Sequence, residues 1–205
     1  MRLFLGFPIP HEFREYARSV QQYLRARGVN ARWVAPERLH VTVQFIGEQD
    51  AAVVPALNAT LATAVRDLRP ARLHGAVPGT FGHPARVLFL GWHEDAGFAA
   101  VVAAVRAALD TAGVRVRAGA RRQSPHAHVT LARFRGGREA RTLRRAGTPC
   151  GRDEWGWAQD FPAATGLAPV DCTALILFES VLHPHGPEYR ELQRLPLGPA
   201  GPVDG

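Results

Sequence analysis

Two short stretches of the chain repeat one four-residue pattern, His-x-Thr-x. The first is His40-Val41-Thr42-Val43 and the second is His128-Val129-Thr130-Leu131. Alternate residues of a β-strand point to the same face, so each copy places an imidazole and a hydroxyl on one face and two apolar side chains on the other. Two imidazoles that face each other could supply a general base and a general acid near neutral pH. The pattern therefore indicates acid–base chemistry on a group held between the two copies.

The setting of the two copies is more specific than the pattern itself. With nine His and ten Thr in the chain, chance alone gives roughly 0.4 copies of His-x-Thr. Both copies, however, lie in strand-like alternation, and each has a distinctive residue five places after its His, Phe45 in the first and Arg133 in the second. The alternative interpretation is a pair of edge-strand histidines with Thr present for its β-propensity.

The composition is that of one sizeable soluble domain. The chain has 205 residues, of which 46% are hydrophobic and 21% charged. No apolar run approaches the ~20 residues that a membrane helix needs, and the first ten residues indicate a strand rather than a signal peptide. We expect a cytoplasmic monomer. The two cysteines, Cys150 and Cys172, lack metal-site spacing and a nucleophile context, so we expect them to be inert.

Positive charge is concentrated around the second pattern. All 25 basic side chains are arginine, the net charge is +7, and the absence of Lys excludes a ligase that works through a lysine–nucleotide adduct. Ten arginines and a single acid, Glu139, lie between Arg115 and Arg145. Because guanidinium groups pair well with phosphate oxygens, this stretch favours a nucleic-acid or phosphate-bearing substrate. The alternative is a solvated, solubilising face.

Hydrophobic periodicity and turn residues predict the elements that position the two patterns. Helices are expected over 11–27, 51–68 and 98–111, with a short Arg-rich helix after Gly136-Gly137. Residues 147–169 are expected to form a loop that covers one lobe, and 1–196 a single bilobal domain followed by a disordered Gly/Pro-rich tail over 197–205. Strands are expected over 2–7, 39–46, 72–77, 86–91, 126–134, 172–180 and 189–196.

Four blocks in order along the chain carry a family resemblance: Arg2-Leu3-Phe4-Leu5 with Pro8 and Pro10; Arg32-Trp33-Val34 with residues 39–47; residues 128–133; and Leu177-Phe178-Glu179-Ser180 with Gly186-Pro187 and Tyr189. Together they resemble the 2H phosphoesterase superfamily, and within it the RNA 2′,3′-cyclic phosphodiesterase family, also called 2′-5′ RNA ligase. One departure is Pro125-His126-Ala127-His128, since in many relatives Pro directly precedes the motif His. His128 is assigned to the motif because only it is followed by x-Thr-Leu-Ala-Arg.

The resemblance implies an α+β fold with two antiparallel-sheet lobes, helices packed outside, and a central cleft lined by the two His-x-Thr-x motifs. It implies hydrolysis of RNA 2′,3′-cyclic phosphate ends to 2′-phosphomonoesters, with reversible ATP-independent 2′-5′ ligation to 5′-OH ends, and no metal or other cofactor. By the same resemblance His40 is the proton donor and His128 the proton acceptor, while Thr42 and Thr130 bind the phosphate.

The resemblance also places Phe45 and Arg133 beside the terminal nucleobase. In a regular strand their odd offset from the motif His would put them on the opposite face. They can reach the site only if each strand ends or twists there, for which Gly47 and Gly136 are suitably placed.

Three other functions remain open from the residues. The first keeps the chemistry but acts on small cyclic nucleotides, ADP-ribose cyclic phosphate or 2′-5′ oligoadenylates. The second is a non-enzymatic RNA-binding module, which would bind RNA in a salt-dependent way and leave cyclic ends intact. The third is a metal enzyme, since His126-x-His128 and His183-x-His185 each put two imidazoles on one strand face, although no well-spaced carboxylate or Cys completes either set.

Overall fold

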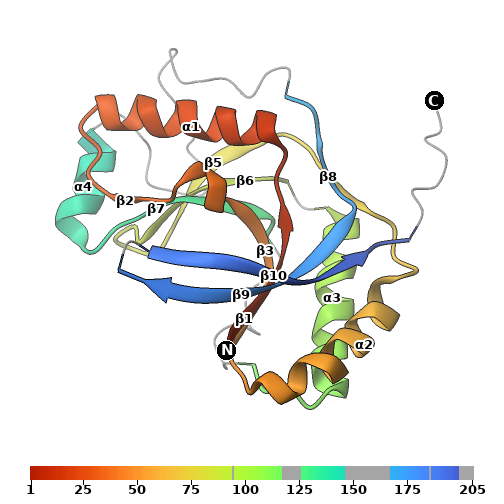
Figure 1. Ribbon diagram of the computed structural model, residues 1–205. Coiled ribbons are helices and arrows are strands. Elements are labelled where there is room, and N and C mark those ends of the chain that lie inside the picture. Colours follow the sequence, from red (N-terminus) through yellow and green to blue (C-terminus); the bar gives the residue numbers. More distant parts are fainter. Residues whose placement is uncertain (94, 117–125, 146–166, 185, 199–205) are drawn as a thin grey trace, which may run out of the picture.

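A large antiparallel sheet forms the centre of the fold (Figure 1). The computed structural model describes residues 1–93, 95–116, 126–145, 167–184 and 186–198. The strands of the sheet follow the order β10-β9-β1-β3-β7-β6-β5, and β2 pairs with β7. Their bounds are β1 Arg2–Pro8, β2 Arg32–Trp33, β3 His40–Glu48, β5 Val77–Phe81, β6 Val87–Gly91, β7 His128–Arg133, β9 Ala174–His183 and β10 Gly186–Pro196.

The sheet consists of two halves that meet at its centre. The strands from β10 to β3 form one half and those from β7 to β5 the other, and Val41 of β3 with Val129 of β7 is the one ladder pair between the two. A separate two-stranded sheet pairs β4 (Ala71–Leu73) with β8 (Val170–Cys172). Each pairing is antiparallel. The expected α+β class with antiparallel sheets is confirmed.

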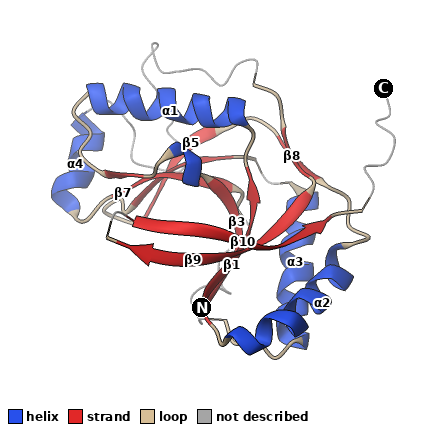
Figure 2. Ribbon diagram, viewed as in Figure 1, coloured by secondary structure: helices blue, strands red, loops and turns tan. Residues whose placement is uncertain are grey.

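Four α-helices accompany the sheets in the described part of the chain (Figure 2). Helices α2 and α3 pack against each other, and α3 also contacts β3 and β4. Phe13 of α1 lies against Trp92, just after β6, with ring centroids 4.8 Å apart. The helix bounds are α1 His11–Ala26, α2 Val54–Val65, α3 Ala96–Thr111 and α4 Gly137–Arg145, with short 3₁₀ turns at Pro36–Arg38 and Ala51–Val53.

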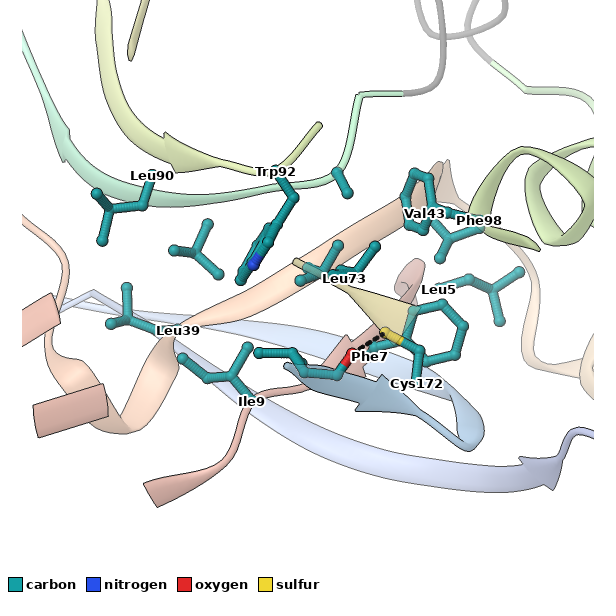
Figure 3. Packing of buried hydrophobic residues seen from close by; sticks show 14 of the residues in the cluster. Leu5, Phe7, Ile9, Leu39, Val43, Leu73, Leu90, Trp92, Phe98 and Cys172 are labelled. Atoms are coloured by element: carbon teal, nitrogen blue, oxygen red, sulfur yellow. Dashed lines mark hydrogen bonds between the residues drawn. The ribbon is translucent and has the colours of Figure 1, made fainter. Parts of the chain in front are cut away.

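The main hydrophobic core lies between these helices and one face of the sheet (Figure 3). Leu5 and Phe7 of β1 pack there with Val43 of β3 and Phe98 of α3. Cys172 belongs to the same core, and burial raises the pKa of its thiol to about 12. A thiol with so high a pKa stays protonated and unreactive near neutral pH. Cys150 lies outside the described residues.

Most expected elements are found, and the differences occur where the chain turns. The expected strand over 72–77 is wrong: β4 ends at Leu73, β5 begins at Val77, and Gly75 between them has a positive φ of 64°, which breaks a strand. The expected strand over 172–180 is divided at Thr173 between two sheets. Helix 51–68 begins as a 3₁₀ turn capped by the Asp50 side chain, and its α-helical part ends at Val65.

The expected loop and tail fall partly outside the described residues. Of 147–169, only 167–169 is described, and 199–205 is likewise not described. Leu197 is buried in the core, and its amide donates a hydrogen bond to the Thr173 carbonyl at 2.9 Å. The packed part of the chain therefore reaches at least this residue. No helix among the described residues is long and apolar enough to cross a membrane.

Candidate active site

The pair Val41–Val129 brings the two His-x-Thr-x motifs together at the centre of the sheet. In an antiparallel ladder the neighbours of such a pair also lie opposite one another, so His40 lies across from Thr130 and Thr42 across from His128. These four motif side chains are half-buried, whereas Val41 and Val129 are fully buried on the opposite face. The two imidazoles and two hydroxyls therefore form a four-cornered group on the face of the sheet away from the core.

Each imidazole is oriented by its own backbone. Nδ1 of His40 lies 2.9 Å from the carbonyl oxygen of Arg38, and Nδ1 of His128 lies 2.8 Å from that of His126. A carbonyl oxygen only accepts, so Nδ1–H is the donor in both rings and the neutral ring has its lone pair on Nε2. Nε2 is thus the atom at which each ring can accept or release a proton.

The surroundings of both imidazoles favour the neutral form. Burial, together with smaller effects of the charges of His128 and Arg133, lowers the pKa of His40 to about 4, against a hydrogen bond to the Arg38 carbonyl that raises it. Burial also lowers the pKa of His128, with smaller contributions in the same direction from His126 and Arg133. An anion bound between the rings would reverse this tendency, because an opposite charge nearby favours the protonated form.

Stacked phenylalanines flank His40 on its side of the sheet. Phe4 of β1 lies 4.8 Å from the His40 ring, centroid to centroid, and stacks at 4.9 Å on Phe178 of β9. Tyr189 of β10 presents its edge to His40 at 5.0 Å. Phe4 is buried but does not belong to the main core. Its side chain instead lines one side of the candidate site, next to His40.

The second half of the sheet repeats this arrangement around His128. Phe89 of β6 stacks at 4.2 Å on Phe81 of β5, and the two rings lie 5.4 and 5.0 Å from the His128 ring. His126 stacks beside His128 at 6.0 Å. A Cβ at Gly79 would overlap the Phe89 ring, so only glycine leaves room for Phe89 in this position. Each imidazole thus stands beside a stacked Phe pair from the two strands that follow in the sheet.

A β-bulge in each motif strand brings the residue at the fifth place after the His back to the site face. The β1–β3 ladder skips Val43, and the β6–β7 ladder skips Leu131; each is the third residue after the motif His. The extra residue shifts the alternation by one. Phe45 therefore pairs with Phe4, with ring centroids 6.1 Å apart, and is 51% exposed. Arg133 is likewise exposed and acts electrostatically on both motif histidines.

A buried glutamine secures the bulge of β7. The Nε2 group of Gln21 on α1 donates to the carbonyl of Leu131 at 3.0 Å and to that of Val34 at 2.7 Å. Val34 N–H also donates to the Leu131 carbonyl, at 2.9 Å. The polar group freed by the bulge is thereby satisfied inside the protein.

The described residues contain no group of three or more His, Cys, Asp or Glu arranged to hold a metal ion. His126 and His128 stack on each other, and Nε2 of His183 lies 3.2 Å from Glu188 in the β9–β10 hairpin. His185 lies outside the described residues. The two histidine pairs considered from the sequence are therefore not completed by a third ligand in the part of the chain that the structure describes.

A fold of two antiparallel halves, each with a His-x-Thr-x strand where the halves meet, is that of a phosphoesterase of the two-histidine class. The model of the 2′-5′ RNA ligase superfamily matches residues 10–153, more than half of the chain. The chain belongs to this superfamily, and the resemblance to the 2H phosphoesterases is confirmed.

Relatives and solved structures agree with this assignment. The RNA 2′,3′-cyclic phosphodiesterase of Aeropyrum pernix is 27% identical over 176 residues, covering 86% of this chain and 92% of the relative. The crystal structure of TT0787 of Thermus thermophilus matches with a TM-score of 0.70 and 28% identity, covering 96% and 98% of the two chains. E. coli LigT in its apo form, at 22% identity, shares the fold with a TM-score of 0.70 over 97% and 98%.

Sequence reasoning missed the aromatic side chains that surround the two motif histidines. Phe4, Phe178 and Tyr189 lie in the blocks that carry the family resemblance, but they were not assigned to the site, and Phe81 and Phe89 lie in none of these blocks. A usable signal was present in β1, where Phe4 stands between two core leucines and so points to the other face. An aromatic residue on the non-core face of a central strand indicates a lined site.

Proposed function

We propose that this protein hydrolyses RNA 2′,3′-cyclic phosphate ends to 2′-phosphomonoesters without a metal ion. The observation that carries the proposal is the antiparallel pair Val41–Val129, which brings the two His-x-Thr-x motifs side by side on neighbouring strands. Two proton-transfer groups and two hydrogen-bond donors suit a reaction at phosphorus, where one oxygen enters and another leaves. The name of the Aeropyrum pernix relative supports the same substrate class.

In the proposed reaction water attacks phosphorus opposite the departing O3′. Neutral His128 takes the proton of the attacking water at Nε2, and protonated His40 donates its Nε2 proton to O3′. The P–O3′ bond breaks and the phosphate remains on O2′. Thr42 and Thr130 hydrogen-bond the non-bridging oxygens, and Arg133 offsets their charge. Phe45 and Arg133 flank the terminal nucleobase.

In the same proposal the site also opens the cyclic phosphate with a different nucleophile. A 5′-OH end replaces water, His128 takes its proton, and its oxygen bonds to phosphorus as O3′ leaves. The product is a 2′-5′ phosphodiester, and the energy comes from the strained cyclic phosphate rather than from ATP. Both motifs come from one chain, so a monomer is the active unit in this proposal.

The decisive experiment uses a short RNA that ends in a 2′,3′-cyclic phosphate, incubated in EDTA with the wild type, His40→Ala and His128→Ala. We expect 2′-phosphate from the wild type and a loss of about 10²–10⁴-fold in rate in each variant. His11→Ala, on the exposed surface of α1, is the matched control and should keep full activity. Cyclic ends left intact by the wild type, or a rate that requires added metal, would reject the proposal.

Competition separates this substrate from the alternatives. Small cyclic nucleotides, ADP-ribose cyclic phosphate and 2′-5′ oligoadenylates are added against the RNA end at equal concentration. Preferential turnover of one of them would reassign the substrate while keeping the two-histidine chemistry. RNA binding with no turnover of any of them would leave a binding module.

A further inference from the structure

Beside His40, the site face of the sheet continues onto a polar row that the proposed chemistry does not use. The registers Leu3–Glu179 and Ser180–Tyr189 place Arg2 of β1, Ser180 of β9 and Tyr189 of β10 next to one another. Arg2 lies two residues before Phe4 in β1 and on the same face of the sheet. The ring centroid of Tyr189 lies 5.0 Å from that of Phe4 and 5.0 Å from that of His40. Figure 1 shows β9 and β10 in blue crossing beside β1.

A second arginine reaches the same place from the 3₁₀ turn before β3. Nη1 of Arg38 donates to the carbonyl of Pro187 at 3.2 Å, and its guanidinium packs over Gly186. This contact holds the guanidinium against the start of β10, close to Tyr189. The carbonyl of Arg38 is also the acceptor that orients His40, so this arginine is fixed relative to the motif.

Three arginines act electrostatically on the Tyr189 hydroxyl. Burial raises the pKa of the Tyr189 hydroxyl, while Arg133, Arg38 and Arg2 all lower it. Within the described residues the side chain of Arg2 forms no hydrogen bond or ion pair. Glu48, which pairs with Arg2 in the β1–β3 ladder, is exposed, and its carboxylate lies 4.0 Å from the N-terminal amino group.

We propose that Arg2, Arg38 and Tyr189 form a second phosphate site, which binds the phosphodiester one nucleotide upstream of the reacting cyclic phosphate. Two guanidinium groups and a phenolic O–H are donors suited to phosphate oxygens. The site makes the protein selective for oligonucleotide ends over free nucleoside cyclic phosphates. This inference rests on the proposed function, since it names the substrate that the same active site prefers.

The first arm of the test varies the substrate and leaves the protein unchanged. Three substrates are compared: a nucleoside 2′,3′-cyclic phosphate, a dinucleotide with the same cyclic end, and that dinucleotide with an uncharged methylphosphonate linkage. We expect kcat/KM for the charged dinucleotide to exceed that for each of the other two by about 10-fold or more, the effect of one charge-assisted contact. Equal values for the charged and uncharged dinucleotides would overturn the inference.

The second arm of the test asks whether Arg2 and Tyr189 cause the preference for the charged dinucleotide. Arg2→Gln and Tyr189→Phe should each reduce the preference for the charged dinucleotide over its methylphosphonate analogue, Arg2→Gln to within about 2-fold of equality. Arg69→Gln, an exposed arginine between α2 and β4, is the control of matched charge and should keep the wild-type preference. A preference that survives in Arg2→Gln would show that another group binds the upstream phosphate and would contradict the assignment.

The two proposals fail in different ways. If no cyclic phosphate of any length is hydrolysed by the wild type, the proposed function fails. If all three substrates are hydrolysed at similar kcat/KM by the wild type, the chemistry stands and the second phosphate site is wrong.

Discussion

Val41 of β3 and Val129 of β7 face each other as the single ladder pair between the two halves of the sheet. Both side chains are fully buried, so the apolar face of the strands fixes the register of the polar face. A one-residue slip would exchange the faces and remove both imidazoles from the site. The chemistry proposed for His40 and His128 therefore depends on hydrophobic packing directly beneath them.

Removing either motif hydroxyl should slow the reaction without unfolding the protein. Thr42→Val and Thr130→Val keep the branched shape and remove the phosphate donor, so we expect kcat/KM for the cyclic RNA end to fall about 10–100-fold. Thr42→Ser and Thr130→Ser retain the hydroxyl and should keep most of the activity. Full activity in the Val variants, with unchanged melting temperature, would show that the hydroxyls do not contact the phosphate.

The pH dependence should differ between the free protein and its complex. The reaction as proposed needs one protonated and one neutral imidazole, which gives a bell-shaped profile. In the empty site burial lowers both pKa values, that of His40 to about 4, so the profile of kcat/KM should have its maximum on the acid side. The bound phosphate anion raises both values, so the maximum of kcat should lie at higher pH. Coincident maxima above pH 7 would contradict this account.

Arg133 should tune that profile by its charge. It lowers the pKa of both motif histidines, in addition to the larger effect of burial. Arg133→Gln should move the maximum of kcat/KM to higher pH and also reduce its height, whereas Arg133→Lys should preserve the position of the maximum. The measurement is the full pH profile of the three proteins on one substrate. An identical maximum in Arg133→Gln would mean that the charge does not reach the histidines.

The buried imidazole also predicts a loss of stability in acid. His40 has a pKa of about 4 in the folded protein and 6.5 as the reference value. Between these values the unfolded state binds more protons, so the free energy of unfolding falls as pH drops from about 6.5 to 4. Between pH 7 and 5 the effect of this group is on the order of 1–2 kcal/mol. Urea denaturation of His40→Gln should show a weaker pH dependence than the wild type, while His11→Gln should match the wild type.

The stacked pair beside His128 can be tested through the glycine beneath it. Gly79→Ala would place a methyl group against the Phe89 ring and force it away from Phe81 and His128. We expect a loss of about 1–3 kcal/mol in the free energy of unfolding together with reduced activity. Gly136→Ala is the control, because a Cβ there meets no atom within 4 Å. Equal stability of the two variants would mean that the ring repacks without cost.

Local sequence pattern predicted the motif strands well because their alternation is regular up to the bulge. His40 to Val43 and His128 to Leu131 lie on the faces that period-two alternation assigns to them. The return of Phe45 and Arg133 to the site face was expected to depend on Gly47 and Gly136. The structure instead places the cause earlier, at Val43 and Leu131, each followed by a second buried residue. In β7 two consecutive apolar residues, Leu131 and Ala132, mark the bulge in the sequence, whereas in β3 the second buried residue is the polar Gln44, which leaves no such mark.

The local sequence pattern could not predict which strands pair with one another. Phe4, Phe178 and Tyr189 meet around His40 although β1 and β9 lie at opposite ends of the chain. The pairing of β4 with β8 is equally remote in sequence. Such contacts depend on the packing of whole elements rather than on spacing, so the resemblance to a family carried the fold further than periodicity did.

Up to Phe45 and Arg133, each motif strand has two phases of alternation that are joined at a bulge. Before the bulge, even offsets from the His face the site; after it, odd offsets do. Deleting Val43 or Leu131 would remove the extra residue, so Phe45 or Arg133 would move to an even offset from the His and would still face the site in a regular strand. If the strand became regular with every residue kept, Phe45 or Arg133 would instead turn toward the core. The bulge therefore decides whether these two side chains share the face of the motif.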